Sequence, residues 1–287
     1  MKRENKGLTK KSRRAVWRAA AAALLLTATV LAVGDSKYHL QLTEHEISLR
    51  NLPAELDGLR IVHLSDLHGS SFGRDNSRLI ELIRLQEPDI IALTGDFAET
   101  EGQLKTVEAL LRGLAGVAPA YYVSGNHEWA GGIASQTKAL MERYGVRCLA
   151  NEYELFERGG AAMVVAGVED PNGWADMIQP EELAERLRQE HPEDFVLWLG
   201  HRNYWVEQYP ELPVDLILSG HAHGGIVRLP FLGGLLNVNH RLIADYETGL
   251  YWSGDYCMEV SRGLGNSIPV PRLFNRPELV VLTLRSK

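Results

Sequence analysis

Metal-binding side chains recur in this sequence directly after short apolar runs. Five such runs end in Gly or Ser, and a residue able to bind a metal follows each of them. These residues are Asp66 and His68, Asp96, Asn126 and His127, His201, and His221 and His223. Mixed imidazole, carboxylate and amide ligands suit Mn, Fe, Zn or Co and do not choose among them. The pattern predicts a metal centre, and its lack of cysteine argues against a thiolate-rich site.

The distribution of histidine supports this prediction. Five of the ten histidines lie in these positions. A single histidine is usually an exposed or hydrogen-bonded residue, but that explanation does not fit five of them at equivalent places beside two aspartates and an asparagine. We interpret His63, which lies inside an apolar run, as a packing residue. Four histidines have no motif around them and receive no role: His39, His45, His191 and His240.

Separate parts of the chain must meet for these side chains to form one site. Seven apolar runs are short and mostly rich in Val, Ile or aromatic residues, as buried strands are: 59–64, 89–94, 120–123, 161–168, 195–199, 214–218 and 279–284. Four amphipathic stretches between them are predicted helices: 76–85, 104–114, 135–144 and 180–190. This alternation predicts an α/β fold with helix-covered sheets. Because ligands bind beyond the carboxyl ends of strands in such folds, five strand ends should meet at one rim.

The N-terminus has a different composition. Residues 1–18 carry eight Lys or Arg and one Glu, a net charge of +7, and the uncharged run 19–34 follows them. We predict a cytoplasmic segment 1–18, a membrane segment 19–34 and an extracytoplasmic catalytic domain 35–287. Whether the membrane segment is cleaved stays open. The export route also stays open between Sec and twin-arginine, because the pair Arg13-Arg14 resembles a twin-arginine signal. We favour an uncleaved anchor.

The body of the chain is acidic. The whole chain has a net charge of −7, so the residues after the basic segment sum to −14. A nucleic-acid partner is therefore not expected, since phosphate backbones bind basic surfaces. The body contains no repeat or low-complexity segment, which favours one domain. Two cysteines, Cys148 and Cys257, are too few for a disulfide framework, and the sequence allows either one bridge or two free thiols. The oligomeric state also stays open.

The metal-binding motifs resemble those of the calcineurin-like metallophosphoesterase family and occur in that family's order. They are Asp66-Leu67-His68, Gly95-Asp96, Gly125-Asn126-His127-Glu128, Gly200-His201 and Gly220-His221-Ala222-His223. The resemblance covers residues 47–284, and Arg262-Gly263-Leu264-Gly265 with Arg276-Pro277-Glu278 is similar to the membrane- or envelope-associated bacterial branch. It implies an α/β fold of two packed mixed β-sheets flanked by helices, a four-layer sandwich, here preceded by one N-terminal membrane helix.

The resemblance also implies a centre with two divalent metal ions. Three residues would bind the first metal: Asp66, His68 and His223. Three would bind the second: Asn126, His201 and His221. Asp96 would bridge both ions, and His127 would lie beside them and protonate the leaving oxygen or steady the phosphate. A hydroxide bridging the ions would then attack phosphorus.

Three further residues are candidates to support the site. Glu99 stands where many relatives carry the aspartate that orients the site histidine, and Glu128 is the other candidate to orient His127. A surface carboxylate is the alternative for Glu128. Arg202 follows a ligand histidine, and two interpretations of it stay open: it contacts the phosphate, or it is an ordinary surface arginine. Ile226 stands where the envelope branch often has glutamine, so a substrate contact by that glutamine is in doubt.

The implied activity is hydrolysis of a phosphodiester or pyrophosphate in the membrane or cell envelope, such as a lipid-linked or cell-wall substrate. A phosphomonoesterase is the first alternative, although residues 97–101 lack the Arg that protein-phosphatase relatives carry there. A metal-binding scaffold without turnover is the second, and the intact motifs argue against it. Candidate substrate loops are residues 69–75, 129–136, 170–177 and 231–245.

Overall fold

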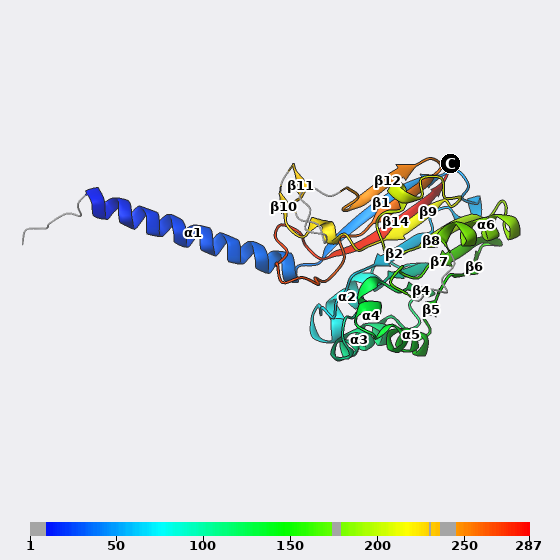
Figure 1. Ribbon diagram of the computed structural model, residues 1–287, viewed down its shortest axis with the longest axis horizontal. Helices are drawn as coiled ribbons and strands as arrows, with labels where there is room; N and C mark the ends of the chain where they lie inside the picture. Colours follow the sequence, from blue (N-terminus) through cyan, green and yellow to red (C-terminus); the bar gives the residue numbers. More distant parts are fainter. Residues whose placement is uncertain (1–9, 174–178, 230, 236–244) are drawn as a thin grey trace, which may run out of the picture.

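A long helix, α1 (Lys10–Tyr38), projects from the rest of the chain (Figure 1). The computed structural model describes residues 10–173, 179–229, 231–235 and 245–287. Helix α1 contains the predicted membrane segment and extends beyond it at both ends. Its most apolar window has a mean hydropathy of 1.9 and is not buried against the protein. At about 1.5 Å per residue, its 29 residues exceed the thickness of a bilayer core of about 30 Å.

The first β-sheet has six strands in the order β1-β14-β2-β3-β4-β5. Their bounds are β1 (Gln41–Leu49), β2 (Arg60–Leu64), β3 (Ile90–Thr94), β4 (Ala120–Val123), β5 (Arg147–Cys148) and β14 (Glu278–Ser286). Strands β2 to β5 are parallel, whereas β14 is antiparallel to β2 and parallel to β1. The last strand of the chain therefore lies between its first two.

The second sheet also has six strands, in the order β12-β13-β9-β8-β7-β6. Their bounds are β6 (Glu152–Arg158), β7 (Ala161–Gly167), β8 (Phe195–Leu199), β9 (Leu216–Ser219), β12 (Gly249–Ser253) and β13 (Tyr256–Val260). The four inner strands are parallel, and the outer two are antiparallel to their neighbours. A small separate ribbon pairs β10 (Arg228–Leu229) with β11 (Gly233–Gly234).

Alternation along each strand separates the three layers of the core. In β2, Ile61 faces the second sheet, whereas Val62 and Leu64 face helices α2 (Ser77–Arg84), α3 (Leu104–Leu114) and α5 (Ala134–Arg143). In β8, Leu197 faces the first sheet and Trp198 faces α6 (Pro180–Glu190) and α7 (Trp205–Gln208). The layers run helices, sheet, sheet, helices, which confirms the predicted four-layer sandwich.

Each predicted strand and helix of the body is present, and its bounds differ from the prediction by at most two residues. Both cysteines are free thiols, Cys148 on β5 and Cys257 on β13. The two sheets therefore hold together through apolar packing and hydrogen bonds.

Candidate metal centre

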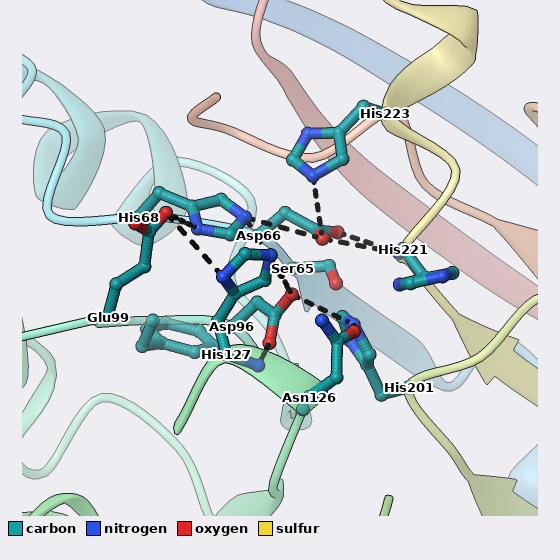
Figure 2. A network of polar contacts seen from close by, with 12 residues as sticks. Ser65, Asp66, His68, Asp96, Glu99, Asn126, His127, His201, His221 and His223 are labelled. Carbon is teal, nitrogen blue, oxygen red and sulfur yellow. Dashed lines mark hydrogen bonds and ion pairs between the residues drawn. The ribbon is translucent and has the colours of Figure 1, made fainter. Parts of the chain in front are cut away.

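Both sheets deliver side chains to a single site. Asp66 and His68 follow β2, Asp96 follows β3, and Asn126 and His127 open the short helix α4 (Asn126–Ala130) after β4. From the second sheet, His201 follows β8, and His221 and His223 follow β9. Figure 2 shows these eight side chains gathered around one point. The prediction that these strand ends meet at one rim is confirmed.

Asp66, His68 and His223 form one buried cluster whose ligand atoms lie within 4.8 Å of one another. Asp66 Oδ1 lies 3.4 Å from His223 Nε2 and 3.8 Å from His68 Nε2. A carboxylate and two imidazoles in this arrangement can hold a divalent metal ion.

Asp96, His201 and His221 form a second cluster with the same spacing. Asp96 Oδ2 lies 3.1 Å from His201 Nε2, and the rings of His201 and His221 have centroids 5.1 Å apart. Asn126 Oδ1 lies 3.2 Å from His201 Nε2, so its amide oxygen is available to the same cluster. This cluster can hold a metal ion as well.

Asp96 connects the two clusters. Its Oδ2 atom lies 3.8 Å from His68 Nε2 in the first cluster and close to His201 in the second. The backbone N–H of His127 donates to the other carboxylate oxygen at 2.8 Å. Within the described part of the chain, buried Asp96 Oδ2 and His68 Nε2 have no hydrogen-bond partner. Unsatisfied buried polar atoms are costly, and a metal ion between the clusters would satisfy both.

The buried carboxylates shift the pKa values of the candidate ligand histidines. Burial alone would lower the pKa of His68, but Asp66 and Glu99 raise it to about 9. Burial would likewise lower the pKa of His201, but the charge of Asp96 raises it to about 10. Burial dominates at His223 and lowers its pKa to about 3. Because imidazole binds a metal only when deprotonated, a metal ion would compete with protons for His68 and His201.

Five of the candidate ligands have left-handed backbone conformations. Their φ angles lie between 45° and 67°, at Asp66, His68, Asp96, His221 and His223. This conformation costs L-residues about 1–2 kcal/mol each and persists only where the surroundings impose it. Here the loops after β2 and β3 bind each other, because Asp66 N donates to Gly95 O at 3.0 Å and His68 N donates to Asp96 O at 2.9 Å.

Two motif glycines allow the strand ends to approach closely. A Cβ atom added to Gly220 would lie 1.9 Å from Ser65 Oγ and 2.3 Å from Asp66 Oδ2. Gly95 has a φ of +79°, and a Cβ atom there would lie 2.6 Å from the backbone nitrogen of Gly125. The glycines that precede the candidate ligands are therefore required by contact between loops.

His127 lies at the edge of the clusters, with 32% of its side chain exposed. Its Nε2 atom is 4.0 Å from Asp96 Oδ2, and its ring packs edge-on against His68 with centroids 4.9 Å apart. Glu99 Oε1 lies 2.7 Å from His68 Nδ1 but 3.9 Å from His127 Nδ1. Glu99 therefore contacts His68 directly and lies beyond hydrogen-bonding distance of His127.

Glu128 is fully buried, so the surface alternative for this residue is wrong. Its carboxylate accepts hydrogen bonds from the backbone N–H groups of Asp96 at 2.9 Å, Phe97 at 2.6 Å and Gly125 at 2.9 Å. Burial, followed by the charge of Asp96, raises the pKa of Glu128 to about 7. Glu128 holds the backbone that presents Asp96, and no bond of it to the His127 ring occurs among the described residues.

Arg202 is not a free surface arginine. Its guanidinium donates two hydrogen bonds to buried Asp170, at 2.5 and 3.0 Å, and Nη1 lies 3.2 Å from His221 Nε2. Asp170 was predicted only as the first residue of the candidate substrate loop 170–177, although it follows β7 and the strand-end rule extends to it. In its ion pair with Asp170, the Arg202 side chain is 21% exposed and lies beside the second cluster.

The loop between β13 and β14 adds two contacts that the sequence pattern did not indicate. Arg272 Nη2 lies 3.4 Å from His223 Nδ1, and Asn275 Nδ2 donates to His223 O at 2.7 Å. This segment has no periodicity from which a side-chain direction can be read. Two of the candidate substrate loops, 170–177 and 231–245, include residues that lie outside the described part of the chain.

Comparisons with known proteins add independent observations. A family model described as calcineurin-like phosphoesterase matches residues 59–225. The metallophosphoesterase YkuE of Bacillus subtilis is 30% identical over 253 residues, which cover 86% of each chain. A metallophosphoesterase of Aquifex aeolicus is 30% identical over 259 residues, covering 87% of this chain and 94% of that one. A Bos taurus protein named transmembrane protein with metallophosphoesterase domain is 28% identical, covering 98% of this chain and 65% of its own.

Proposed function

The chain belongs to the calcineurin-like metallophosphoesterase family and is a metal-dependent phosphoesterase, and from this premise we propose that it hydrolyses a phosphodiester or pyrophosphate of the membrane or cell envelope. We propose two divalent ions for the centre, drawn from Mn, Fe, Zn or Co. The observation that carries the proposal is the position of Asp96, whose Oδ2 atom lies 3.8 Å from His68 and 3.1 Å from His201.

The proposed ligands follow the two clusters. The first ion takes Asp66, His68 and His223, and the second takes Asn126, His201 and His221. Asp96 joins both sets, because a carboxylate has two oxygens to share. When bound, the ions would place positive charge beside the phosphoryl oxygens and would lower the pKa of a bound water to about 7.

The protein groups have separate tasks in this proposal. His127 is not assigned as a ligand in this proposal, although it lies within ligand distance of His68 and Asp96, and its partly exposed ring suits a donor of a proton to the leaving oxygen. Arg202, held by Asp170, keeps a positive charge beside the second cluster. Glu128 and the motif glycines keep Asp96 in its strained conformation, so that its carboxylate is positioned before substrate arrives.

The test compares two esters on the full-length protein in detergent. The protein is stripped of metal, reloaded with each of the four metals, and assayed with a chromogenic phosphodiester and the matching monoester. We expect metal-dependent cleavage of the diester. Asp96→Asn should lower kcat/KM by more than about 100-fold, since even outer-shell partners of metal ligands are worth about 10–100-fold. Asp255→Asn, which changes an aspartate whose side chain is 93% exposed and which lies outside the candidate substrate loops, is the matched control.

Each other outcome of this assay has a defined meaning. Preference for the monoester would replace the proposal with a phosphomonoesterase. Bound metal with no turnover of either ester would contradict the proposed hydrolase and leave a metal-holding scaffold.

The same proposal includes a membrane anchor. Residues 1–18 are cytoplasmic, residues 19–34 cross the membrane, and residues 35–287 form an extracytoplasmic catalytic domain. The exposed apolar surface of α1 supports the anchor, and the positive flank supports the orientation. A relative named as a transmembrane protein covers almost the whole chain, helix included.

A further inference from the structure

The C-terminal end of α1 is bound to the loop between β13 and β14. Asp35 accepts two hydrogen bonds from the guanidinium of Arg276, at 2.7 and 2.8 Å. One residue later, buried Ser36 accepts a hydrogen bond from the backbone N–H of Asn275 at 3.3 Å. The apolar run of α1 ends at Gly34. These contacts therefore fix where the sandwich sits relative to the end of the proposed membrane segment.

The same loop backs onto the metal centre. Asn275 bonds to Ser36 through its backbone and donates through its side chain to His223 O at 2.7 Å. Arg272, a few residues earlier, lies 3.4 Å from the ring of His223. A single residue, Asn275, thus separates a candidate metal ligand from the helix that would enter the membrane.

Four exposed apolar side chains lie on the β13–β14 loop and on the β10–β11 segment that is bonded to it. Phe231 and Leu232 lie at the tip between β10 and β11, and Val270 and Phe274 lie on the β13–β14 loop. We call these four residues the apolar rim. Hydrogen bonds between Leu273 and both Ile226 and Arg228 hold the two segments together. Figure 1 shows β10 and β11 beside the end of α1, on the side of the sandwich that the helix leaves.

The two aromatic residues of the apolar rim are exposed and have left-handed backbone conformations. Phe231 has a φ of 69° and is fully exposed, and Phe274 has a φ of 53° and is 57% exposed. Bulky side chains rarely adopt this conformation, and aromatic rings facing water gain nothing from burial. Two such residues at one junction indicate a surface shaped for an apolar environment.

A cavity lies between α1 and the same loop. It has a volume of about 380 Å³ and is lined by Val33 and Lys37 of α1 and by Leu264, Pro269, Pro271 and Arg272 of the loop. Its walls are mixed, since Ser36, Ser70 and Asn266 also line it, and Arg272 is a buried cation that also contacts His223. The cavity therefore extends from the end of the anchor to a side chain that touches the first metal cluster.

We infer that the apolar rim is a bilayer-docking surface, which seats the metal centre at the lipid–water boundary so that it acts on phosphate esters carried by lipids. The inference rests on the proposed phosphoesterase function and on the proposed anchor. The bilayer is the occupant because α1 brings it to this face and ends its apolar run one residue before Asp35 binds Arg276. Aromatic residues are enriched at this depth of membranes.

Docking is measured on the full chain reconstituted in vesicles of phosphatidylcholine and phosphatidylglycerol. Phe231→Trp and Phe274→Trp each add a fluorophore at the apolar rim, and Leu155→Trp adds one on the exposed face of β6, at the opposite end of the sandwich in Figure 1. Lipids brominated high on the acyl chain should quench the fluorescence added at the rim and spare that added on β6. Equal quenching at all three positions, or none at the rim, overturns the inference.

The consequence for substrate is measured with two esters of the same chemistry. Para-nitrophenyl hexadecyl phosphate is embedded in the vesicles, and para-nitrophenyl methyl phosphate is dissolved in water. In the double variant Val270→Ser/Phe274→Ser, which leaves the candidate substrate loops unchanged, hydrolysis of the embedded ester should fall by about tenfold, the loss expected from about one buried apolar side chain. The dissolved ester should be hydrolysed at the parent rate, and Leu155→Ser should alter neither rate.

These results separate the two proposals. If the parent protein hydrolyses neither ester, the proposed function fails, while the quenching still decides whether the rim docks. If the parent hydrolyses both esters but the rim variant retains full activity on the embedded one, the docking inference fails and the phosphoesterase stands. Loss of both activities in the rim variant, with unchanged thermal unfolding, also overturns the docking role.

Discussion

At the scale of single residues, the side chain of His127 is 32% exposed, whereas those of His68 and Asp96 beside it are buried. His127 also lies within ligand distance of His68 and Asp96, so its role needs a direct test. We expect His127→Asn to keep the full metal content and to lose about 10²–10⁴-fold in kcat, the usual contribution of general acid catalysis. Metal analysis and steady-state kinetics on one preparation measure both quantities. Loss of a bound metal in the variant would instead show that His127 is a metal ligand.

Glu99 should act through His68. Its carboxylate lies 2.7 Å from His68 Nδ1, which fixes the ring so that Nε2 faces the carboxylates of Asp66 and Asp96. Glu99→Gln should therefore weaken metal binding by about 10–100-fold, as outer-shell changes at metal-bound histidines do. Competition with a chelator measures the affinity, and Glu101→Gln on the adjacent turn is the control. Unchanged affinity combined with a lower kcat would place Glu99 with His127 instead.

The residue types of the centre were predictable because each candidate ligand directly follows a strand. The roles of their neighbours were not, because they depend on where a side chain points. Glu128 follows His127 in sequence, yet it turns inward to the backbone of Asp96. Asp170 follows β7, so the strand-end rule extends to it, whereas Arg272 reaches the centre from a loop whose approach only tertiary packing determines.

At the scale of elements, burial on both faces decides which strands can be predicted. Strands β2, β3, β4 and β8 are buried almost throughout and read as continuous apolar runs. Strands β1, β6 and β12 lie at sheet edges; exposed polar residues interrupt the patterns of β1 and β6, and β12 is only partly buried, with Trp252 exposed. Strand β13 is fully buried but contains Glu259, whose carboxylate meets His63 Nδ1 at 2.5 Å. His63, interpreted as a packing residue, is buried there.

Glu278 at the start of β14 ties that strand to β1 and to the loop at the metal centre. It accepts hydrogen bonds from Thr43 Oγ1 at 2.5 Å, from Arg262 Nη2 at 2.6 Å and from Arg262 N at 2.9 Å. Burial would raise the pKa of Glu278, but the bonds and charge of Arg262 lower it below 4.5. The carboxylate therefore stabilises the fold fully above pH 4.5, and this contribution is lost as pH falls through the lowered pKa.

Glu278→Gln should accordingly reduce the free energy of unfolding by about 1–3 kcal/mol at pH 7, the cost of weakening a buried hydrogen-bonded group. The difference from the parent should shrink as pH falls below 4.5. Denaturant unfolding of metal-free protein across a pH series measures it. Glu44→Gln, on the exposed face of neighbouring β1, should have no such pH dependence. A constant difference at every pH would rule out the ionised pair as its source.

At the scale of the whole molecule, the charge asymmetry of the N-terminus should determine orientation. When the full chain is expressed in bacteria, protease added to intact spheroplasts should remove the sandwich and leave a small membrane-bound N-terminal fragment. Neutralising the basic residues of segment 1–18 should reduce the accessible fraction. Protection of the sandwich until the membrane is permeabilised would reverse the proposed topology.

The position of β14 has a consequence for biosynthesis. Strands β1 and β2 are made early, yet they pair with β14, which is formed by residues 278–286. The first sheet therefore cannot close, and Asp66, which follows β2, is not held in place, until residues 278–286 have been made. Metal capture is thus a late step. The ions that enter are those of the compartment in which the finished chain folds, not those surrounding the nascent chain.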